Sequence, residues 1–286
     1  MPARTARGLI AQSRRKILQP NFTPTPGAWN SNGITASWLG HSTVLINFYG
    51  VNILTDPVLM SHIGADVRLG TIGPKRLVAP ALTPGQLPKI DLVLLSHAHM
   101  DHLNSATLRH FPGTTRAVTA HATADLLRDT RLRSPMELKW GDKVQVNTSH
   151  GEVEVEAFEV RHWGARWRHD SYRGYNGYIV AREGKKIIFG GDTAWSDSFR
   201  ALRSRGPFEF AIMPIGAYSP WIQSHCTPEQ AVQMANDAGA KYFLPIHFKT
   251  FTLGREGVVE PLERLQAAIE AERIGWKDIG QTFCTS

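Results

Sequence analysis

The segment 96–102 reads Ser-His-Ala-His-Met-Asp-His and places four potential metal ligands within six residues, directly after an apolar stretch. Imidazole suits zinc and similar metals, and a neighbouring carboxylate lowers the charge of a metal pair. His97 and His99, two residues apart in an extended loop, can point at one metal. Asp101 and His102 then fall on the other side and face a second. The alternative is a chance cluster of surface histidines, which fits poorly with four ligands crowded at a strand end.

Two metals need more ligands than one loop supplies, so further His or Asp residues are expected at other strand ends. Three side chains stand shortly after short apolar or alternating segments: His162, Asp192 and His247. Gly190 and Gly191 precede Asp192 and let the backbone come close to a ligand. Each residue alone is more often structural, but the three are placed alike. Three imidazoles can hold one metal, and two imidazoles with an aspartate the other, with Asp192 shared.

These residues give the chain a resemblance to the metallo-β-lactamase-fold hydrolases, whose signature H-x-H-x-D-H stands here at residues 97–102. Within that superfamily the chain is most similar to the N-acyl-phosphatidylethanolamine-hydrolysing phospholipase D group and its bacterial relatives. The signature is specific for the superfamily, and the other motifs are more specific for the subgroup. These motifs run in order from about residue 34 to 252: Trp38-Leu39-Gly40-His41, Leu54-Thr55-Asp56-Pro57, Gly73-Pro74-Lys75-Arg76, Gly190-Gly191-Asp192-Thr193, Pro214-Ile215-Gly216-Ala217-Tyr218, His225-Cys226-Thr227-Pro228 and Ile246-His247-Phe248-Lys249.

The resemblance implies a fold and a ligand set. The fold would be α/β, a four-layer αββα sandwich of two mixed β-sheets. The cofactor would be two divalent ions, with Zn²⁺ expected first and Mn²⁺ or Fe²⁺ also able to accept such ligands. The resemblance assigns the first ion to His97, His99 and His162, the second to Asp101, His102 and His247, and a bridging role to Asp192.

Two details of this ligand set separate branches of the superfamily. Diiron relatives that reduce oxygen carry Glu in place of His99, so the imidazole favours a hydrolytic zinc enzyme over a redox enzyme. Relatives that open antibiotics often lack the bridging aspartate, so Asp192 counts against a true β-lactamase.

The chemistry expected from such a site is hydrolysis. Two ions that share a water lower its pKa from ~16 toward ~7, so a metal-bridging hydroxide is the expected nucleophile. Asp101 would bind one ion and also accept a hydrogen bond from this hydroxide, which makes it catalytic. His225 lies in a loop that the resemblance places over the metals, and we expect it to donate a hydrogen bond to the substrate or to protonate the leaving group. The alternative is a structural histidine that orients its loop.

Several further residues are expected around the metals. Tyr218, Trp221 and Trp163 would supply apolar walls for the substrate, and the alternative for each is a place in the ordinary core. We expect His41 and Asp56 to orient metal ligands through hydrogen bonds rather than to bind metal themselves.

The elements that position these residues follow from the hydrophobic pattern. Strands dominate between residues 143 and 190, with a hairpin turn at Glu183-Gly184, and further strands are expected at 34–39, 43–48, 51–55, 91–95, 116–119, 210–215 and 241–246. Helices are expected at 105–110, 122–128, 196–204, 228–238 and 260–271. Thr227-Pro228 is a helix start in its own right. Segment 57–88 is rich in Gly and Pro and shows little periodicity. This order predicts two sheets packed face to face, with helices outside.

The 286 residues suffice for one large domain at 33–286, preceded by a basic arm and lead-in at 1–32. The net charge is +7. The arm could lie as a basic helix on an anionic membrane, which would suit a lipid substrate, or it could be a solvated tail. Five of its residues are positively charged: Arg4, Arg7, Arg14, Arg15 and Lys16.

Composition also bounds the compartment. No stretch approaches the ~20 apolar residues that span a bilayer, and the N-terminus lacks a secretory segment. Cys226 and Cys284 are the only cysteines, which fits a reducing compartment. We therefore expect a cytoplasmic protein, with room for peripheral contact at the inner membrane face.

The leading functional expectation is a metal-dependent phosphodiesterase acting on a small-molecule or lipid phosphodiester, such as N-acyl-phosphatidylethanolamine. The alternative is a lactonase or a β-lactam-type ring-opening hydrolase. A remote alternative is a non-catalytic, metal-stabilised nucleic-acid-binding module, whose mark would be a missing ligand, and none of the seven is missing. No dedicated nucleic-acid partner is expected, because no interleaved aromatic–basic groove is evident. The sequence leaves the oligomeric state open, a homodimer included.

Overall fold

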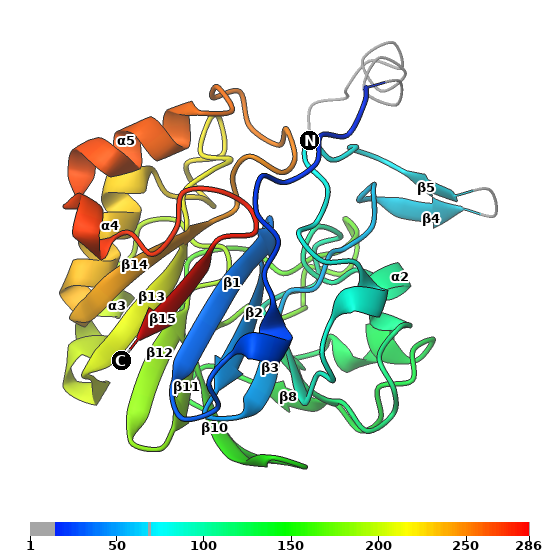
Figure 1. Ribbon diagram of the computed structural model, residues 1–286. Helices are drawn as coiled ribbons and strands as arrows, with labels where there is room; N and C mark the ends of the chain where they lie inside the picture. Colours follow the sequence, from blue (N-terminus) through cyan, green and yellow to red (C-terminus); the bar gives the residue numbers. More distant parts are fainter. Residues whose placement is uncertain (1–14, 68–69, 286) are drawn as a thin grey trace.

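Two mixed β-sheets face each other and helices cover their outer sides, so the four-layer αββα sandwich expected from the sequence is confirmed (Figure 1). The computed structural model describes residues 15–67 and 70–285 of the chain. Among these residues, strands of both sheets supply many of the largest fully buried side chains, including Trp38, Phe48, Phe189 and Phe210. The core therefore joins the two sheets.

The seven-stranded sheet carries the H-x-H-x-D-H loop. Its strand order is β15-β1-β2-β3-β6-β7-β8, antiparallel from β15 to β3 and parallel from β3 to β8. Strand β6 is buried on both faces, which explains why it appears as an uninterrupted apolar run. The strands are β1 (Ile34–Gly40), β2 (Thr43–Phe48), β3 (Val51–Thr55), β6 (Leu92–Leu95), β7 (Arg116–Ala120), β8 (Met136–Leu138) and β15 (Thr282–Thr285).

The six-stranded sheet carries the three distant ligand candidates. Its order is β14-β13-β12-β11-β10-β9, antiparallel from β9 to β12 and parallel from β12 to β14. Glu183 and Gly184 have φ values of 50° and 70° and form the predicted hairpin turn. The strands are β9 (Lys143–Thr148), β10 (Gly151–Phe158), β11 (Gly177–Arg182), β12 (Lys185–Phe189), β13 (Phe208–Pro214) and β14 (Ala240–Ile246).

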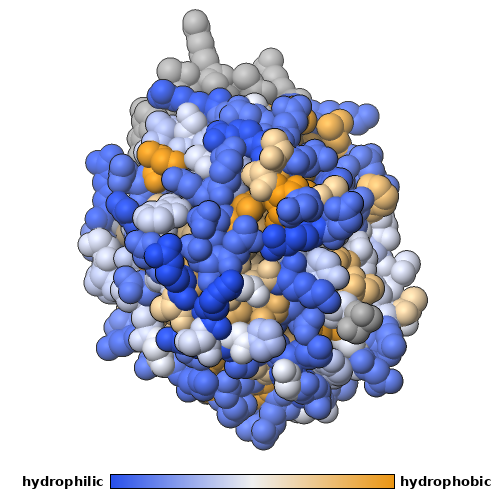
Figure 2. Space-filling model, turned by 90° about the vertical axis from the view of Figure 1, so that its left-hand side faces the viewer, coloured by the Kyte–Doolittle hydropathy of each residue, from blue (hydrophilic) through white to orange (hydrophobic). Residues whose placement is uncertain are grey.

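Helices α3 (Ser198–Leu202), α4 (Pro228–Ala238) and α5 (Glu260–Ala268) cover the six-stranded sheet at the left of Figure 1, and α2 (Ser105–Leu108) lies at the opposite side. The start of α4 confirms its predicted cap, because Thr227 Oγ1 accepts a hydrogen bond from the Gln230 amide at 3.3 Å. Figure 2 shows that the side covered by α3–α5 is mainly hydrophilic, with scattered hydrophobic areas. This is the pattern of amphipathic helices, which bury an apolar face against the sheet and expose a polar face to solvent.

Single-turn 3₁₀ helices connect the larger elements. They are η1 (Pro26–Ala28), η2 (Pro84–Gln86), η3 (Ala124–Leu127), η4 (Arg203–Arg205) and η5 (Ala271–Arg273). None of the helices in the described ranges has the length and the apolar character needed to cross a membrane.

Four predicted helices are shorter than expected. The helix expected at 122–128 is only the 3₁₀ helix η3, because Ala122 has a φ of 56° and lies outside the helical region. The helix expected at 196–204 is α3 followed by η4, and those expected at 105–110 and 260–271 end early, at Leu108 and Ala268. Short helices gain little from propensity alone, so their ends depend on tertiary contacts.

Three features of the β-structure were not predicted, one of which is the short strand β8 at Met136–Leu138. Segment 57–88 contains a small hairpin, β4 (Ala65–Val67) and β5 (Gly70–Ile72), within what looked like an irregular loop. A Cβ on Gly64 would lie 2.1 Å from the carbonyl oxygen of Ile72, so this crossing requires glycine. Strand β15 pairs with β1, but four residues are too few for their alternation to reveal a strand.

The lead-in is attached to the domain. Residues 1–14 of the basic arm lie outside the described residues. Arg15 donates from Nη2 to the Lys75 carbonyl at 2.8 Å, and the Leu18 amide donates to the Leu77 carbonyl at 2.9 Å. The lead-in therefore packs along segment 75–79, and the division into 1–32 and 33–286 stays a prediction.

Strand β10 offers a matched test of the packing between sheet and helix. Phe158 is buried, with its ring 5.3 Å from that of Phe199 on α3. We expect Phe158→Ala to lower the free energy of unfolding by about 3–5 kcal/mol, because it removes a buried ring and leaves a cavity. Glu152→Ala, at an exposed position of the same strand, should change it by less than about 0.5 kcal/mol. Urea denaturation measures both, and equal effects would contradict the packing described.

Candidate metal centre

Three imidazoles meet where β6 and β10 end. Nε2 of His97 lies 2.8 Å from Nδ1 of His99, and Nε2 of His162 lies 3.3 Å from that same nitrogen. All three nitrogens lie within 4.8 Å of one another. These are the donor type and the number that the sequence analysis assigned to a first ion.

A second group of donors lies beside the first. Asp101 Oδ2 is 3.7 Å from Nε2 of His102 and 3.6 Å from Nε2 of His247. Asp101 and His102 come from the loop after β6, whereas His247 directly follows β14. The two sheets therefore contribute jointly to this group.

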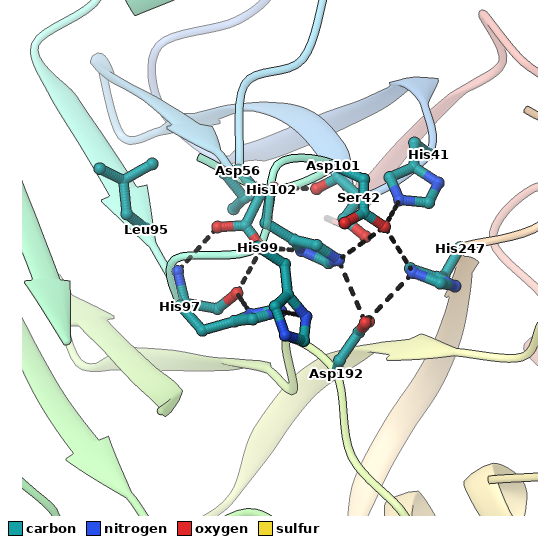
Figure 3. A network of polar contacts seen from close by, with 12 residues as sticks. His41, Ser42, Asp56, Leu95, His97, His99, Asp101, His102, Asp192 and His247 are labelled. Atoms are coloured by element: carbon teal, nitrogen blue, oxygen red, sulfur yellow. Dashed lines mark hydrogen bonds and ion pairs between the residues drawn. The ribbon is translucent and has the colours of Figure 1, made fainter. Parts of the chain in front are cut away.

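Asp192 lies between the two groups (Figure 3). Its Oδ2 is 3.1 Å from Nε2 of His102, 3.2 Å from Nε2 of His247 and 3.9 Å from Nε2 of His162. One carboxylate oxygen thus faces donors of both groups, as a bridging ligand must. The structure brings together all seven side chains that the sequence singled out.

The donor atoms fit divalent ions. Among the described residues, Nε2 of His102, Nε2 of His247 and Oδ1 of Asp192 are buried and have no hydrogen-bond partner. A buried polar atom without a partner is costly, and a cation would satisfy all three. Imidazole and carboxylate are also the ligands that zinc, manganese and iron accept.

The two groups differ electrostatically in the metal-free protein. Burial lowers the pKa of His99 to about 3, reinforced by His162, and also lowers the pKa of His97. Burial lowers the pKa of His247 as well, but Asp192 and Asp101 outweigh it and raise the value to about 9. The pKa of His102 is raised well above its usual range, because Asp192, Asp101 and Asp56 together outweigh its burial. The first group is therefore neutral near pH 7, and the second carries protons.

Backbone conformation fixes Asp192 and His247 in place. Gly191 has a φ of 58°, and a Cβ there would lie 2.8 Å from Cβ of Ser96, so the turn before Asp192 requires glycine. His247 itself has a φ of 67°, which is strained for a residue with a side chain. Its amide donates to the carbonyl of His41 at 3.0 Å, which helps to hold this conformation.

Asp56 orients the signature loop. Its carboxylate accepts hydrogen bonds from the amide and the hydroxyl of Ser96 at 2.7 and 2.5 Å, and it lies 2.6 Å from Nδ1 of His102. Ser96 Oγ in turn lies 2.8 Å from Nδ1 of His97. Asp56 thus contacts His102 directly and reaches His97 through Ser96, so it supports one imidazole of each group, as expected from the sequence.

His41 approaches the second group more closely than a supporting role requires. Its Nε2 lies 3.0 Å from Oδ2 of Asp101, and its ring centroid lies 4.2 Å from that of His247. One ring nitrogen of His41 also lies within 4.8 Å of donor atoms of Asp101, His102 and His247. The expected hydrogen bond to a ligand is present, and the same position would also allow ligation.

Arg166 is a functional candidate that the sequence analysis missed. Its guanidinium donates to the carbonyls of Ala98 and Leu103 at 3.0 and 2.9 Å, one inside and one just after the signature loop. Arg166 follows His162 by four residues, so one loop supplies a ligand candidate and also an arginine that holds the signature loop by hydrogen bonds. The only available signal was its closeness in sequence to His162, which is too weak to identify it.

His225 reaches the metal centre from the turn before α4. Its Nδ1 lies 3.8 Å from Oδ2 of Asp192, and its ring centroid lies 5.2 Å from that of His162. The amides of Ser224 and His225 both donate to the Trp221 carbonyl, and the Ser224 carbonyl lies 2.7 Å from Nδ1 of His162. This turn therefore fixes both histidines.

The three aromatic residues predicted as substrate walls are placed differently. Trp163 is half exposed, with its ring centroid 4.6 Å from that of His99, so it stands at the mouth of the site. Trp221 is partly buried and forms the turn described above. The structure does not bring Tyr218 to the cluster, because its hydroxyl donates to Glu260 and its ring packs under Arg264.

The role of Asp56 can be measured through metal affinity. Asp56→Asn keeps the shape but removes the negative charge that faces His102, so we expect the affinity for metal to fall about 10–100-fold. Competition with a chromophoric chelator measures this change. The matched control is Asp197→Asn, which alters a largely exposed carboxylate and should leave the affinity unchanged. Equal affinities for both variants and the parent would exclude the proposed support.

The protonation difference predicts how metal occupancy depends on pH. Histidine binds metal only when it is deprotonated, and His102 and His247 carry protons below their raised pKa values, about 9 for His247. Affinity at the second group should therefore rise with pH, whereas the already neutral first group should change little. Elemental analysis after dialysis at about pH 8 and about pH 6 should show that one metal equivalent is lost first on acidification. Parallel loss of both equivalents would contradict this asymmetry.

Comparison with known proteins agrees with this geometry. Residues 51–248 match the family described as "Beta-lactamase superfamily domain". An uncharacterized protein of Mycobacterium tuberculosis is 32% identical over 275 residues, which cover 92% of this chain and 71% of the relative. N-acyl-phosphatidylethanolamine-hydrolyzing phospholipase D 1 of Caenorhabditis elegans is 28% identical over 257 residues, 85% of this chain and 71% of that enzyme.

A solved structure supports the fold. Igni18, described as a novel metallo hydrolase from Ignicoccus hospitalis, superposes with a TM-score of 0.66 at 20% identity and covers 88% of this chain and 98% of that protein. The chain therefore belongs to the beta-lactamase superfamily domain family and is a metal-dependent hydrolase of the metallo-β-lactamase fold.

Proposed function

We propose that this protein hydrolyses phosphodiesters with two divalent ions, Zn²⁺ first among them, and that its substrate is a phospholipid such as N-acyl-phosphatidylethanolamine or a related glycerophospho compound. The observation that carries the proposal is the position of Asp192 Oδ2 between two groups of buried donors. The 28% identity to a phospholipase D of this specificity supports the choice of substrate class.

The residues of the first group, His97, His99 and His162, would hold one ion. Asp101, His102 and His247 would hold the other, with Asp192 shared between them. When bound, the two ions lower the pKa of water toward ~7 and offset the negative charge of the phosphoryl oxygens.

Asp101 has a second task beside ligation. His41 lies 3.0 Å from its Oδ2 and fixes how the carboxylate is turned. A carboxylate held in this way can accept a hydrogen bond from the attacking water and aim it at phosphorus. Its pKa lies well below the usual range, because the neighbouring imidazoles of His102, His247 and His41 outweigh its burial, so it stays ionised.

His225 is placed to contact the substrate. Its Nδ1 is buried and has no hydrogen-bond partner among the described residues. Burial lowers the pKa of this imidazole well below its usual range, so the ring is neutral near pH 7. A neutral ring still donates one hydrogen bond, which favours contact with a phosphoryl oxygen over protonation of the leaving group.

A comparison of three substrates tests the reaction class. We expect hydrolysis of bis(p-nitrophenyl) phosphate to exceed hydrolysis of an acyl-homoserine lactone and of a chromogenic cephalosporin. Faster turnover of the lactone or the cephalosporin would replace the proposal with ring-opening hydrolysis. Salt-dependent nucleic-acid binding without any hydrolysis would favour the non-catalytic alternative.

Substitution of His225 tests its role. His225→Ala should leave the metal content intact and lower kcat for bis(p-nitrophenyl) phosphate by at least ~100-fold, because the substrate loses a placed donor. The control is His110→Ala, which alters an exposed histidine after α2. Elemental analysis and steady-state kinetics measure both variants. Unchanged turnover would assign His225 to loop structure, and lost metal would assign it to the ligand set.

A further inference from the structure

The loop after His162 ends in a tip, residues 167–172, that exposes two large aromatic side chains. Trp167 is 48% exposed and Tyr172 is 65% exposed. Both are residues whose ring surface normally contributes strongly to burial or to an interface. Arg168 and His169 between them are also exposed, so the tip combines aromatic and cationic groups.

The tip is held firmly although its aromatic residues face solvent. The buried carboxylate of Asp170 accepts a hydrogen bond from the Trp167 amide and another from Nε of Arg173, both at 2.7 Å. Arg173 also pairs with both carboxylate oxygens of Asp125, at 2.5 and 2.9 Å. An ion network of the buried Asp170 and Arg173 with the exposed Asp125 thus orders the backbone beneath the exposed rings, so binding a partner would cost little further ordering.

The tip adjoins the metal centre. The same loop starts at His162, and Arg166 fastens it to the signature loop through the Ala98 and Leu103 carbonyls. Trp163, 51% exposed, touches His99 at the mouth of the site. Trp195 is 37% exposed and follows Ala194, which forms a β-bridge with Arg161. Exposed aromatic residues therefore extend from the mouth of the site along this loop.

The charge of the loop is one-sided. Segment 161–173 contains four arginines and a single acidic residue, Asp170, which is buried. Arg161 and Arg168 are exposed. Tryptophan and tyrosine with neighbouring cations are the side chains that settle at the headgroup level of a bilayer.

We propose that segment 161–172 docks the protein on the surface of an anionic phospholipid bilayer and so brings the metal centre to the headgroups. This inference rests on the proposed function, because it supplies the surface on which a lipid phosphodiester is found. A nucleic-acid strand is the competing partner, since this segment interleaves aromatic and basic residues. Stacking of bases needs open ring faces, however, and the guanidinium carbon of Arg173 lies over the Tyr172 ring, 5.4 Å from its centroid. This favours the bilayer over a nucleic-acid strand.

Co-sedimentation of the metal-loaded 286-residue chain with large vesicles tests the proposal. We expect binding to vesicles of phosphatidylcholine and phosphatidylserine, and at least ~10-fold weaker partition for Trp167→Ser/Tyr172→Ser. Arg168→Gln should weaken partition about fivefold on these vesicles and not on phosphatidylcholine alone. The matched control is Phe22→Ser, which removes an aromatic ring that is 45% exposed on the lead-in and should bind like the parent.

Circular dichroism and the thermal midpoint of unfolding establish that each variant is folded. Trp167→Phe keeps an aromatic ring at this position and should partition onto the vesicles like the parent. Parent-like partition of the double variant, or equal binding to both vesicle types, would overturn the proposal. Binding of a single-stranded oligonucleotide that the double variant loses, without vesicle binding, would assign the surface to nucleic acid instead. Vesicle binding and hydrolysis are measured separately. If the protein binds vesicles but does not hydrolyse bis(p-nitrophenyl) phosphate, the proposed function is refuted and the proposed docking surface is not.

Discussion

Buried imidazoles and carboxylates crowd together at one end of the sandwich, and without cations this arrangement would be unfavourable. Oδ2 of Asp192 lies within 4 Å of nitrogens from four histidines, while Nε2 of His102 and of His247 lack hydrogen-bond partners among the described residues. Desolvated donors of this kind persist only where a ligand compensates them. The surrounding structure therefore has to prevent these donors from relaxing apart.

Strained backbone at the strand ends provides that restraint. His41, Asp56 and His247 have φ values of 54°, 32° and 67°, and each such conformation costs about 1–3 kcal/mol. Hydrogen bonds hold them: the His41 amide donates to Thr250 Oγ1 at 2.6 Å, and the His247 amide donates to the His41 carbonyl. These hydrogen bonds thus offset the strain and help to keep the site preformed.

The sequence predicted what depends on local pattern. The seven ligand candidates were identifiable because each follows an apolar or alternating strand. The turn at Glu183-Gly184 and the cap at Thr227 were identifiable because their chemistry is local. Arg166 was missed because its partners, Ala98 and Leu103, lie more than 60 residues away in the chain. The position of Tyr218 against Arg264 and the shortening of the helices likewise arise from tertiary packing, which no spacing rule contains.

The division of the ligands between the two sheets has a consequence for the life of the protein in a cell. The signature loop leaves β6, in the seven-stranded sheet, whereas His162, Asp192 and His247 follow strands of the six-stranded sheet. Metal ions bound by ligands from both sheets would connect the two sheets. Metal binding would therefore stabilise the folded state over the unfolded chain by mass action. A shortage of metal would then abolish the activity and also destabilise the fold, which makes the chain more susceptible to proteolysis. The abundance of the protein would therefore depend on the metal supply.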